Sequence, residues 1–286
     1  MSAAFYRLLR VLLVAGLMSA PSVALADPAS EVAALRWQKG PAEAQIGTLA
    51  TLRVPDGMMF LDAADTRRFL ELTGNPPRDN NYTLAPKDHG WFAIFRFDSR
   101  GYVKDDEKLD PDHLLKALQA GDAKGNQERN RLKMTPLYTD GWHVPPHYDA
   151  ESKRLEWGVR LRTEQGEKIV NYTVRILGRR GVMQAILVSD PQQLDRDMVA
   201  FKAALQGYDF ASGQRYSEFR AGDHVAEYGL AALVVGGAAA AAAKTGAGKA
   251  LFKMLIYGGI AAFGVVGAAV RKLFGRTQSP PAKVEG

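Results

Sequence analysis

The densest group of reactive side chains in the sequence lies in the segment GWHVPPHYD, residues 141–149. It holds His143, His147 and Asp149, and Asp140 directly precedes it. Two imidazoles and two carboxylates could bind a metal ion through nitrogen and oxygen, or place a histidine beside an orienting aspartate for acid–base catalysis. His143, His147 and Asp149 are therefore the candidate catalytic residues.

The spacing of these residues gives such a site little support. His143 and His147 are four positions apart, which would place them on one face of a helix. Pro145 and Pro146 lie between them and force an extended path, in which the two rings need not converge. We favour a rigid loop packed against the edge of a sheet over a metal site.

Two further charged segments are weaker candidates. GYVKDDE, residues 101–107, has consecutive acids that could bind a hard cation, but it lacks the spacing of a calcium loop and indicates a solvated turn. The turn at residues 178–181 carries Arg179 and Arg180, which could bind a phosphate or carboxylate, including one on a lipid. A tight hairpin turn is the simpler interpretation.

Other kinds of chemistry have no signature here. The sequence has no cysteine, which excludes thiolate zinc sites and cysteine nucleophiles. There is no nucleophile elbow and no dinucleotide fingerprint, and KTGAGK, residues 244–249, lacks the first glycine and the final Ser or Thr of a phosphate-binding loop. We therefore expect no cofactor and no resident metal.

The first 26 residues have the layout of a secretory signal peptide. Arg7 and Arg10 lie beside an apolar run, and a small-residue cleavage site ends at Ala26. We expect cleavage after Ala26 and a domain outside the cytoplasm. Without cysteine, that domain must rely on its hydrophobic core and not on disulfides.

A membrane anchor is predicted near the C-terminus. Seventeen uncharged residues lie between Lys253 and Arg271, and residues 250–270 are about long enough to cross a bilayer. An earlier uncharged run, 228–243, is mostly alanine and glycine, and it either forms a helical hairpin with this span or leads into it. The basic residues after the span favour a single span.

These segments divide the chain into four parts. We predict a signal peptide over 1–26, a periplasmic domain over 27–222, a membrane anchor over 223–276 and a disordered tail over 277–286. The formal charge of +6 lies at the two ends: two arginines precede residue 27, and the tail from Lys244 carries seven basic residues against one acid. The domain is thus slightly acidic, and nucleic acid is not expected as a partner.

The hydrophobic pattern of the domain predicts an α+β fold. Three adjacent runs, 154–163, 169–178 and 182–190, alternate in strand fashion and are joined by short turns, which predicts an antiparallel meander. The helix that follows places its apolar residues on one stripe that could cover the sheet. Earlier elements are expected as a strand-like start at 46–62, a helix from Asp62 or Asp65 to Leu72, a polar loop at 75–90, a strand at 91–98, and a helix at 109–133 broken in two at Gly121 and Gly125.

Five motifs occur in a fixed order along the chain. They are GYVKDDE at 101–107, GWHVPPHYD at 141–149, NYTVRILGRRG at 171–181, GQRYSEF at 213–219 and AEYGLAALVVGG at 226–237. With these motifs the chain closely resembles an uncharacterised family of membrane-anchored bacterial proteins, domain of unknown function 2167. The resemblance covers nearly all of the mature chain. It implies a membrane-anchored envelope protein and supplies no activity, substrate or catalytic residue.

The predicted location of the domain and the lack of residues spaced for catalysis together suggest a function. We expect a non-enzymatic protein of the bacterial inner membrane whose periplasmic domain binds a partner protein or a lipid. The alternative is a periplasmic metal-dependent hydrolase that uses the 140–149 segment. A third hypothesis, a subunit of a larger membrane assembly, rests on the small-residue faces of the predicted spans.

Overall fold

The computed structural model describes residues 28–131 and 133–236. Its centre is an antiparallel sheet of eight strands in the order β1-β4-β5-β6-β10-β9-β8-β7, with a second sheet of three strands in the order β11-β3-β2. The large sheet comprises β1 (Gln38–Lys39), β4 (Met58–Leu61), β5 (Asn81–Pro86), β6 (Trp91–Asp98), β10 (Val182–Ser189), β9 (Lys168–Leu177), β8 (Arg154–Arg162) and β7 (Tyr138–Asp149). The small sheet comprises β11 (Tyr208–Phe210), β3 (Ala50–Val54) and β2 (Ala42–Ile46).

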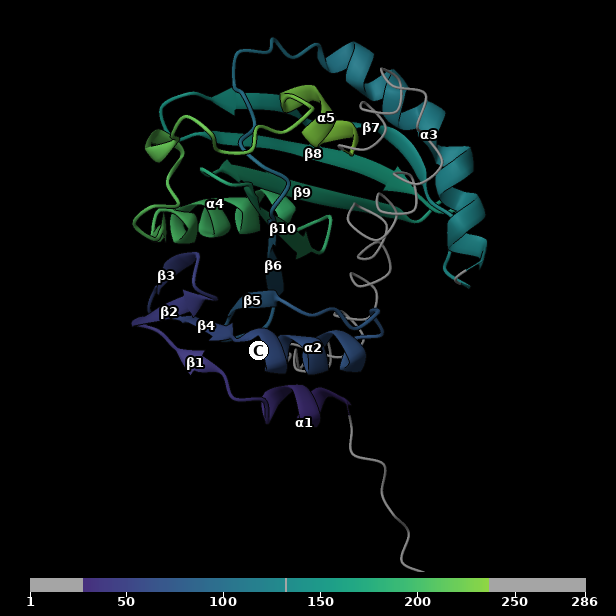
Figure 1. Cartoon of the computed structure of the whole chain (residues 1–286). Coiled ribbons are helices and arrows are strands. Elements are labelled where there is room, and N and C mark those ends of the chain that lie inside the picture. Colours follow the sequence, from purple (N-terminus) through teal and green to yellow (C-terminus); the bar gives the residue numbers. More distant parts are fainter. Residues whose placement is uncertain (1–27, 132, 237–286) are drawn as a thin grey trace, which may run out of the picture.

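The helices lie on both faces of the large sheet (Figure 1). They are α1 (Pro28–Ala33), α2 (Ala63–Leu72), α3 (Pro111–Arg131), α4 (Leu194–Leu205) and α5 (Leu230–Val235), with a short 3-10 turn, η1, at Tyr216–Glu218. The predicted α+β class with a large antiparallel sheet is confirmed. The predicted meander is also confirmed, because β8, β9 and β10 are consecutive antiparallel neighbours.

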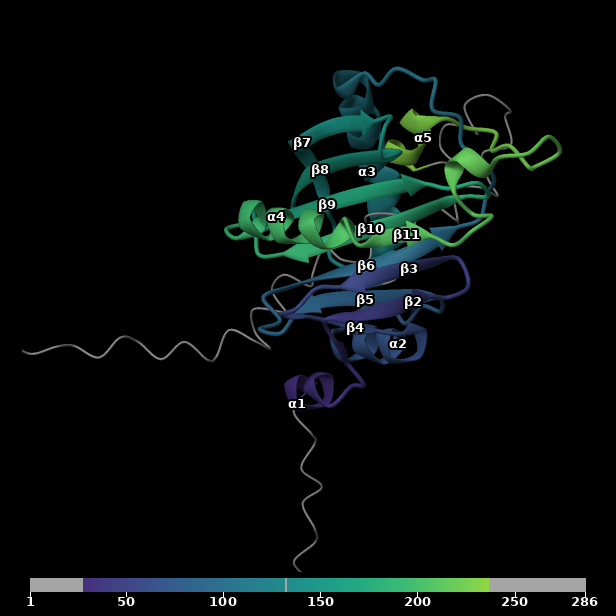
Figure 2. The ribbon, with the colours of Figure 1, turned by 90° about the vertical axis from the view of Figure 1, so that its left-hand side faces the viewer.

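One face of the large sheet is covered by α4 and the small sheet, which lie in front of the strands in Figure 2. The predicted apolar stripe of α4 is confirmed, since Leu194, Phe201 and Leu205 are buried there and Met198 is partly buried. Alternate residues of β6, β9 and β10 complete this first apolar cluster. Tyr172 belongs to it, and its hydroxyl donates a 2.7 Å hydrogen bond to Glu156.

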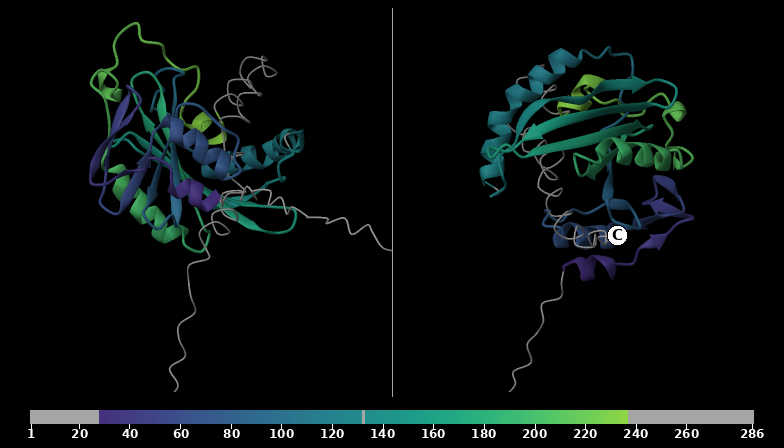
Figure 3. Two further views of the ribbon diagram at one scale, coloured as in Figure 1. Left: turned by 90° about the horizontal axis from the view of Figure 1, so that it is seen from below. Right: turned by 180° about the vertical axis from the view of Figure 1, so that it is seen from behind.

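The opposite face carries two separate apolar clusters. The second cluster lies under α1 and α2 and includes Phe69, Ile94 and Ile186. The third lies under α3 and α5 and includes Trp157 and Leu233. Seen from behind, α3 and α5 lie over one end of the sheet and α1 and α2 over the other (Figure 3).

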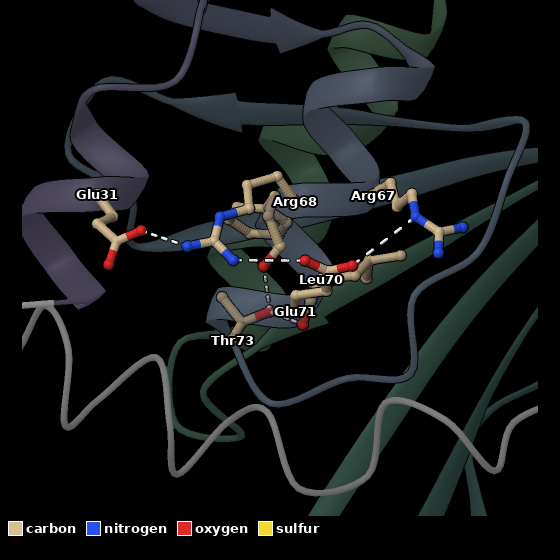
Figure 4. Close-up of polar contacts among 7 residues, drawn as sticks. Glu31, Arg67, Arg68, Leu70, Glu71 and Thr73 are labelled. Carbon is tan, nitrogen blue, oxygen red and sulfur yellow. Dashed lines mark hydrogen bonds and ion pairs between the residues drawn. The ribbon is translucent and has the colours of Figure 1, made fainter.

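Local signals explain α2. The Asp62 carboxylate accepts a 2.9 Å hydrogen bond from the Asp65 amide, which caps the helix as predicted. On its outer surface Arg68 pairs with Glu31 of α1 and with Glu71, while Glu71 also faces Arg67 (Figure 4). The Arg68–Glu31 pair links α1 to α2, and the two pairs of Glu71 lie within α2; exposed pairs of this kind contribute little to stability.

Two expectations about the first half are wrong. The strand-like segment 46–62 does contain strands, namely β3, β4 and the last residue of β2, but the expected polar loop at 75–90 contains β5. The helix expected at 109–133 is not broken at its glycines, since α3 is continuous. Asn126 explains the last result: its side chain makes two 2.8 Å hydrogen bonds to the Leu137 backbone, and such tertiary contacts outweigh the helix propensity of glycine.

Several predicted segments fall wholly or partly outside the described residues. The signal peptide over 1–26, the span over 250–270 and the tail over 277–286 lie outside them entirely. Of the earlier run, 228–243, the structure describes residues up to 236, and these include α5, whose Leu230, Leu233 and Val234 are buried in the third cluster. In the part of the chain that the structure describes, none of the helices has the length and apolar character needed to cross a membrane.

Candidate functional site

The predicted catalytic segment is the edge strand β7 and not a loop. Pro145 and Pro146 lie at a register shift between Val144 and His147, where two residues of β7 oppose one of β8. Proline is tolerated at such a place because the edge of a sheet and a bulge need no amide donor. Because β7 is extended, the four residues from His143 to His147 span up to about 13 Å, less any shortening at the bulge.

Each candidate residue of this strand has a different environment. The Nε2 atom of His143 lies 2.7 Å from Asp195 at the start of α4, and this carboxylate is 81% exposed. His147 is exposed. Asp149 accepts hydrogen bonds from the Ser152 hydroxyl and the Glu151 amide, and these bonds lower the pKa of Asp149. The structure therefore does not bring the three candidates together.

A metal site is not assembled in the described residues either. Within 28–131 and 133–236 no three side chains of His, Asp, Glu or Cys converge closely enough to hold a metal ion. Asp140, the fourth member of the predicted cluster, lies 4.0 Å from Arg160 of the neighbouring strand, with both side chains about half exposed.

The sequence motifs do meet, but at a different place, around Asp105. This carboxylate accepts hydrogen bonds from Lys153 (2.8 Å), Tyr148 (2.8 Å) and Tyr216 (3.0 Å). Partial burial opposes its ionisation, but the three bonds prevail and lower the pKa of Asp105. Burial and the bond to Asp105 raise the pKa values of both tyrosines. The expectation of a solvated turn is wrong for Asp105 and right for its exposed neighbour Asp106.

The remaining motifs tie into the same region, which we call the motif junction. Arg179 is buried and makes a bidentate ion pair with Asp223, at 2.7 and 2.8 Å. This pair raises the pKa of Arg179 and lowers the pKa of Asp223 to about 2. The expected tight turn at 178–181 is confirmed, with a 2.8 Å hydrogen bond from the Gly178 amide to the Gly181 carbonyl. Arg179 is thus occupied by a partner within the chain.

Close backbone contacts hold the junction together. Gly101 has φ +104°, and a Cβ atom there would lie 2.7 Å from the carbonyl oxygen of His224. The amide of Tyr102 donates to that same carbonyl at 2.8 Å, and the Ala226 amide donates to the carbonyl of Tyr102. Glycine is required at 101 because of this approach and this φ. The motifs of the family resemblance therefore pack against one another, and the junction that they form has a structural role.

A second group of polar side chains lies in the middle of the sheet, on the face of α2 and α5. Gln184 of β10 is directly opposite Arg175 of β9 on one side and Arg96 of β6 on the other. Arg96 is in turn opposite Asn81 of β5. Residues directly opposite in an antiparallel sheet point to the same face. These four residues, Asn81, Arg96, Gln184 and Arg175, form what we call the polar row.

The polar row separates the second and third apolar clusters. On one side of it, two positions along their strands, Ile94 and Ile186 belong to the second cluster. On the other side, Val182 and Leu177 belong to the third. Three members of the row are nevertheless buried: Asn81 is 1%, Gln184 6% and Arg175 8% exposed.

Buried polar groups in the row lack partners. In the described parts of the chain no hydrogen bond reaches the Nε atom of Arg175 or the Oδ1 atom of Asn81. The indole nitrogen of Trp157, diagonally across from Arg175 on the same face, also has none. Most buried polar groups in proteins are hydrogen-bonded, and an unpaired buried charge is costly. Burial lowers the pKa of Arg175, but a guanidinium stays cationic at neutral pH.

The sequence contained a signal for this row that the search for motifs missed. Arg96 and Gln184 each interrupt a mostly apolar run, FAIFRFD and VMQAILVS, whereas Arg175 follows Asn171 and Thr173 at alternate positions of NYTVRIL. A polar residue at an inward position of such a strand is a marker of function or of a buried network. Reading each strand for its exceptions would have indicated these residues, although not that they lie side by side.

Comparisons with known proteins supply a family and no activity. The family model described as "Protein of unknown function (DUF2167)" matches residues 38–269, which is most of the chain. No curated protein matches the chain significantly. Among solved structures, the chain is similar to the solution structure of cyanobacterial PsbP (CyanoP) from Synechocystis sp. PCC 6803, with a TM-score of 0.33 and 8% identity. That match covers 57% of this chain and 86% of the other, and its score is too low to carry an argument.

Proposed function

We propose, from the premise that the chain belongs to the family of proteins of unknown function DUF2167, that it is a membrane-anchored envelope protein whose domain binds a partner protein or lipid. The domain is proposed to lie in the periplasm. The polar row is the observation that carries the binding role. Buried polar groups without internal partners are typical of a surface that receives its partners from a bound molecule.

The catalytic alternative has less support. A hydrolase needs a nucleophile or metal beside a base, and these groups must lie within hydrogen-bond reach. His143 is instead beside an exposed carboxylate of α4, and His147 and Asp149 face solvent. The charged groups of the motif junction bond to one another and have no free reactive atom in common.

The anchoring part of the proposal depends on residues 250–270. The residues that give the earlier run its hydrophobicity, Leu230, Leu233 and Val234, pack in the third apolar cluster. Placing them in lipid would require their removal from the core. This packing supports one span over 250–270 and not a hairpin that begins at 228.

Membrane extraction tests the anchoring. The full chain should stay with the membrane pellet in alkaline carbonate, whereas a variant that lacks residues 250–270 should appear in the periplasmic fraction. A full chain released by carbonate would contradict anchoring. A phosphatase reporter fused after Gly286 should be inactive if the chain has one span, because its C-terminus would then be cytoplasmic. Activity outside would contradict the single-span model.

Metal analysis tests the binding module against the hydrolase. The full chain, extracted in neutral detergent, should carry no stoichiometric metal that depends on His147. A metal bound in a 1:1 ratio and lost in His147→Ala would overturn the non-enzymatic assignment. Lys153→Ala, which disturbs the motif junction and not β7, serves as the control for indirect effects of substitution.

A further inference from the structure

We infer that the polar row binds an oxyanion, the carboxylate or phosphate group of a lipid headgroup or of a free organic anion, with Arg175 as its counter-ion. The inference rests on the proposed binding function and adds the site and the ligand class to it. Its basis is a charge and several hydrogen-bonding atoms that the described residues leave unsatisfied on one face of the sheet.

The first step is the charge. No carboxylate of the described residues forms an ion pair with Arg175. Asp98 acts on it at a distance, but this carboxylate lies 3.0 Å from the guanidinium of Arg100. The surroundings of Arg175 therefore have more cationic than anionic groups, and an anion is the charge that would balance them.

The second step is the kind of atom that is unpartnered. The Nε atom of Arg175 and the indole nitrogen of Trp157 are donors that cannot accept, and both are buried without an acceptor. Gln184, which lies beside Arg175, has an amide that can donate as well. A guanidinium with neighbouring donors suits the oxygens of a carboxylate or phosphate, which arginine binds through paired hydrogen bonds.

The third step concerns the size of the ligand. Asn81 is three strands away from Arg175, or about 14 Å at the usual spacing between strands. The unpartnered atom of Asn81 is its Oδ1, which accepts hydrogen bonds. At this far end of the row the ligand would therefore have to supply a hydrogen-bond donor. An inorganic anion would satisfy the Arg175 end alone. An organic anion with a hydroxyl or amino group would satisfy both ends.

The other arginines of the same hairpin provide a matched comparison. Arg179 is already paired with Asp223, so it has little capacity for a ligand. Arg180 is exposed on the turn, where any anion could meet it without a built site. A stabilisation by added anion that depends on Arg175 and not on Arg180 therefore distinguishes binding at the polar row from general attraction of anions to surface charge.

The experiment measures thermal unfolding of the full chain in neutral detergent, with inorganic phosphate or succinate against sodium chloride of equal ionic strength. At ten times its Kd, an anion bound to the folded state should raise the Tm by about 3 to 6 °C. Arg175→Met should abolish this shift, and Arg180→Met should leave it unchanged. A shift that survives Arg175→Met or disappears in Arg180→Met would overturn the inference.

A second variant and a lipid arm complete the design. Gln184→Met keeps the charge of Arg175 but removes a donor, and it should weaken phosphate binding several-fold by calorimetry. If the oxyanion belongs to a lipid headgroup, phosphatidylglycerol nanodiscs should raise the Tm relative to phosphatidylcholine nanodiscs, again only with Arg175 present. No Arg175-dependent shift in any arm would overturn the inference. Carbonate extraction does not depend on Arg175, so loss of anchoring would be a separate failure of the proposed function.

Discussion

Arg175 and Arg179 are four positions apart near the end of β9, and both are buried, yet their surroundings differ. Arg179 lies in the motif junction, where Asp223 accepts two of its hydrogen bonds and the Gly213 carbonyl a third. Arg175 lies in the polar row, where its Nε atom has no acceptor among the described residues. A buried charge that is paired within the chain belongs to the structural core, whereas a buried charge without such a partner is suited to binding a ligand. The comparison assigns stability to the junction and binding to the row.

The largest effect should come from breaking the junction. Asp105→Asn removes a charged acceptor that serves Tyr148, Tyr216 and Lys153, and it should lower the free energy of unfolding by about 2 to 3 kcal/mol. Asp106→Asn is the control, because this neighbouring side chain is exposed, and it should change stability by less than about 0.5 kcal/mol. Urea unfolding measures both. Equal effects would show that Asp105 has no special role.

The next prediction compares two buried side-chain amides, one outside the polar row and one within it. Asn126 has both its hydrogen bonds, so Asn126→Leu should destabilise the protein by about 1 to 3 kcal/mol. Gln184 is 6% exposed and lies between the arginines of the row, so Gln184→Met, of similar shape, should stabilise the ligand-free protein by about 1 kcal/mol. Differential scanning fluorimetry gives both shifts. A loss of stability in Gln184→Met would mean that the amide has a structural partner.

Acid unfolding separates the two regions by their titration. The pKa of Asp223 is lowered to about 2, mainly by Arg179, so the ion pair stabilises the fold above about pH 4 and is lost as the pH falls towards 2. Asp223→Asn should therefore flatten the dependence of stability on pH between 4 and 2. Gln184→Met should run parallel to the unchanged chain, because the row contains no acid. Parallel curves for Asp223→Asn would contradict the assignment.

The smallest effect is expected on β7. The pair of His143 with Asp195 joins a partly exposed imidazole to a carboxylate that is 81% exposed. Such surface pairs contribute about 0 to 1 kcal/mol, and His143→Ala should change stability by no more than about 0.5 kcal/mol. Chemical denaturation measures it, with Asp195→Ala as the reciprocal control. A change of several kcal/mol would place β7 among the structural centres of the fold.

Much of the fold could be predicted from local patterns. The meander, the strand at 91–98, the cap at Asp62 and the stripe of α4 all follow from alternation, turns and capping, which act within a few residues. The continuous α3 could not be predicted, because the hydrogen bonds of Asn126 reach Leu137, just before β7, and outweigh two helix glycines. The strand β5 was hidden in a polar segment, and one of its two partners, β4, is separated from it in sequence by α2.

The site was harder to predict than the fold for a physical reason. Reactive residues close in sequence, such as His143 and His147, are easy to notice, but an extended strand keeps them apart. The polar row arises from the register of four strands, so its members come from positions 81 to 184 and have no common motif. Polar exceptions in apolar strands were visible in the sequence, whereas their alignment required the sheet order.

The most direct test of the account compares two substitutions in the same anion-free protein, dialysed extensively against chloride buffer. Arg175→Met removes an unpaired buried charge and should raise the Tm by about 2 to 4 °C. Arg179→Met leaves Asp223 without its partner and should lower the Tm, by at least as much as Asp105→Asn. Opposite signs are the predicted result. If both substitutions lower the Tm, Arg175 is a structural residue and the polar row is not a binding site.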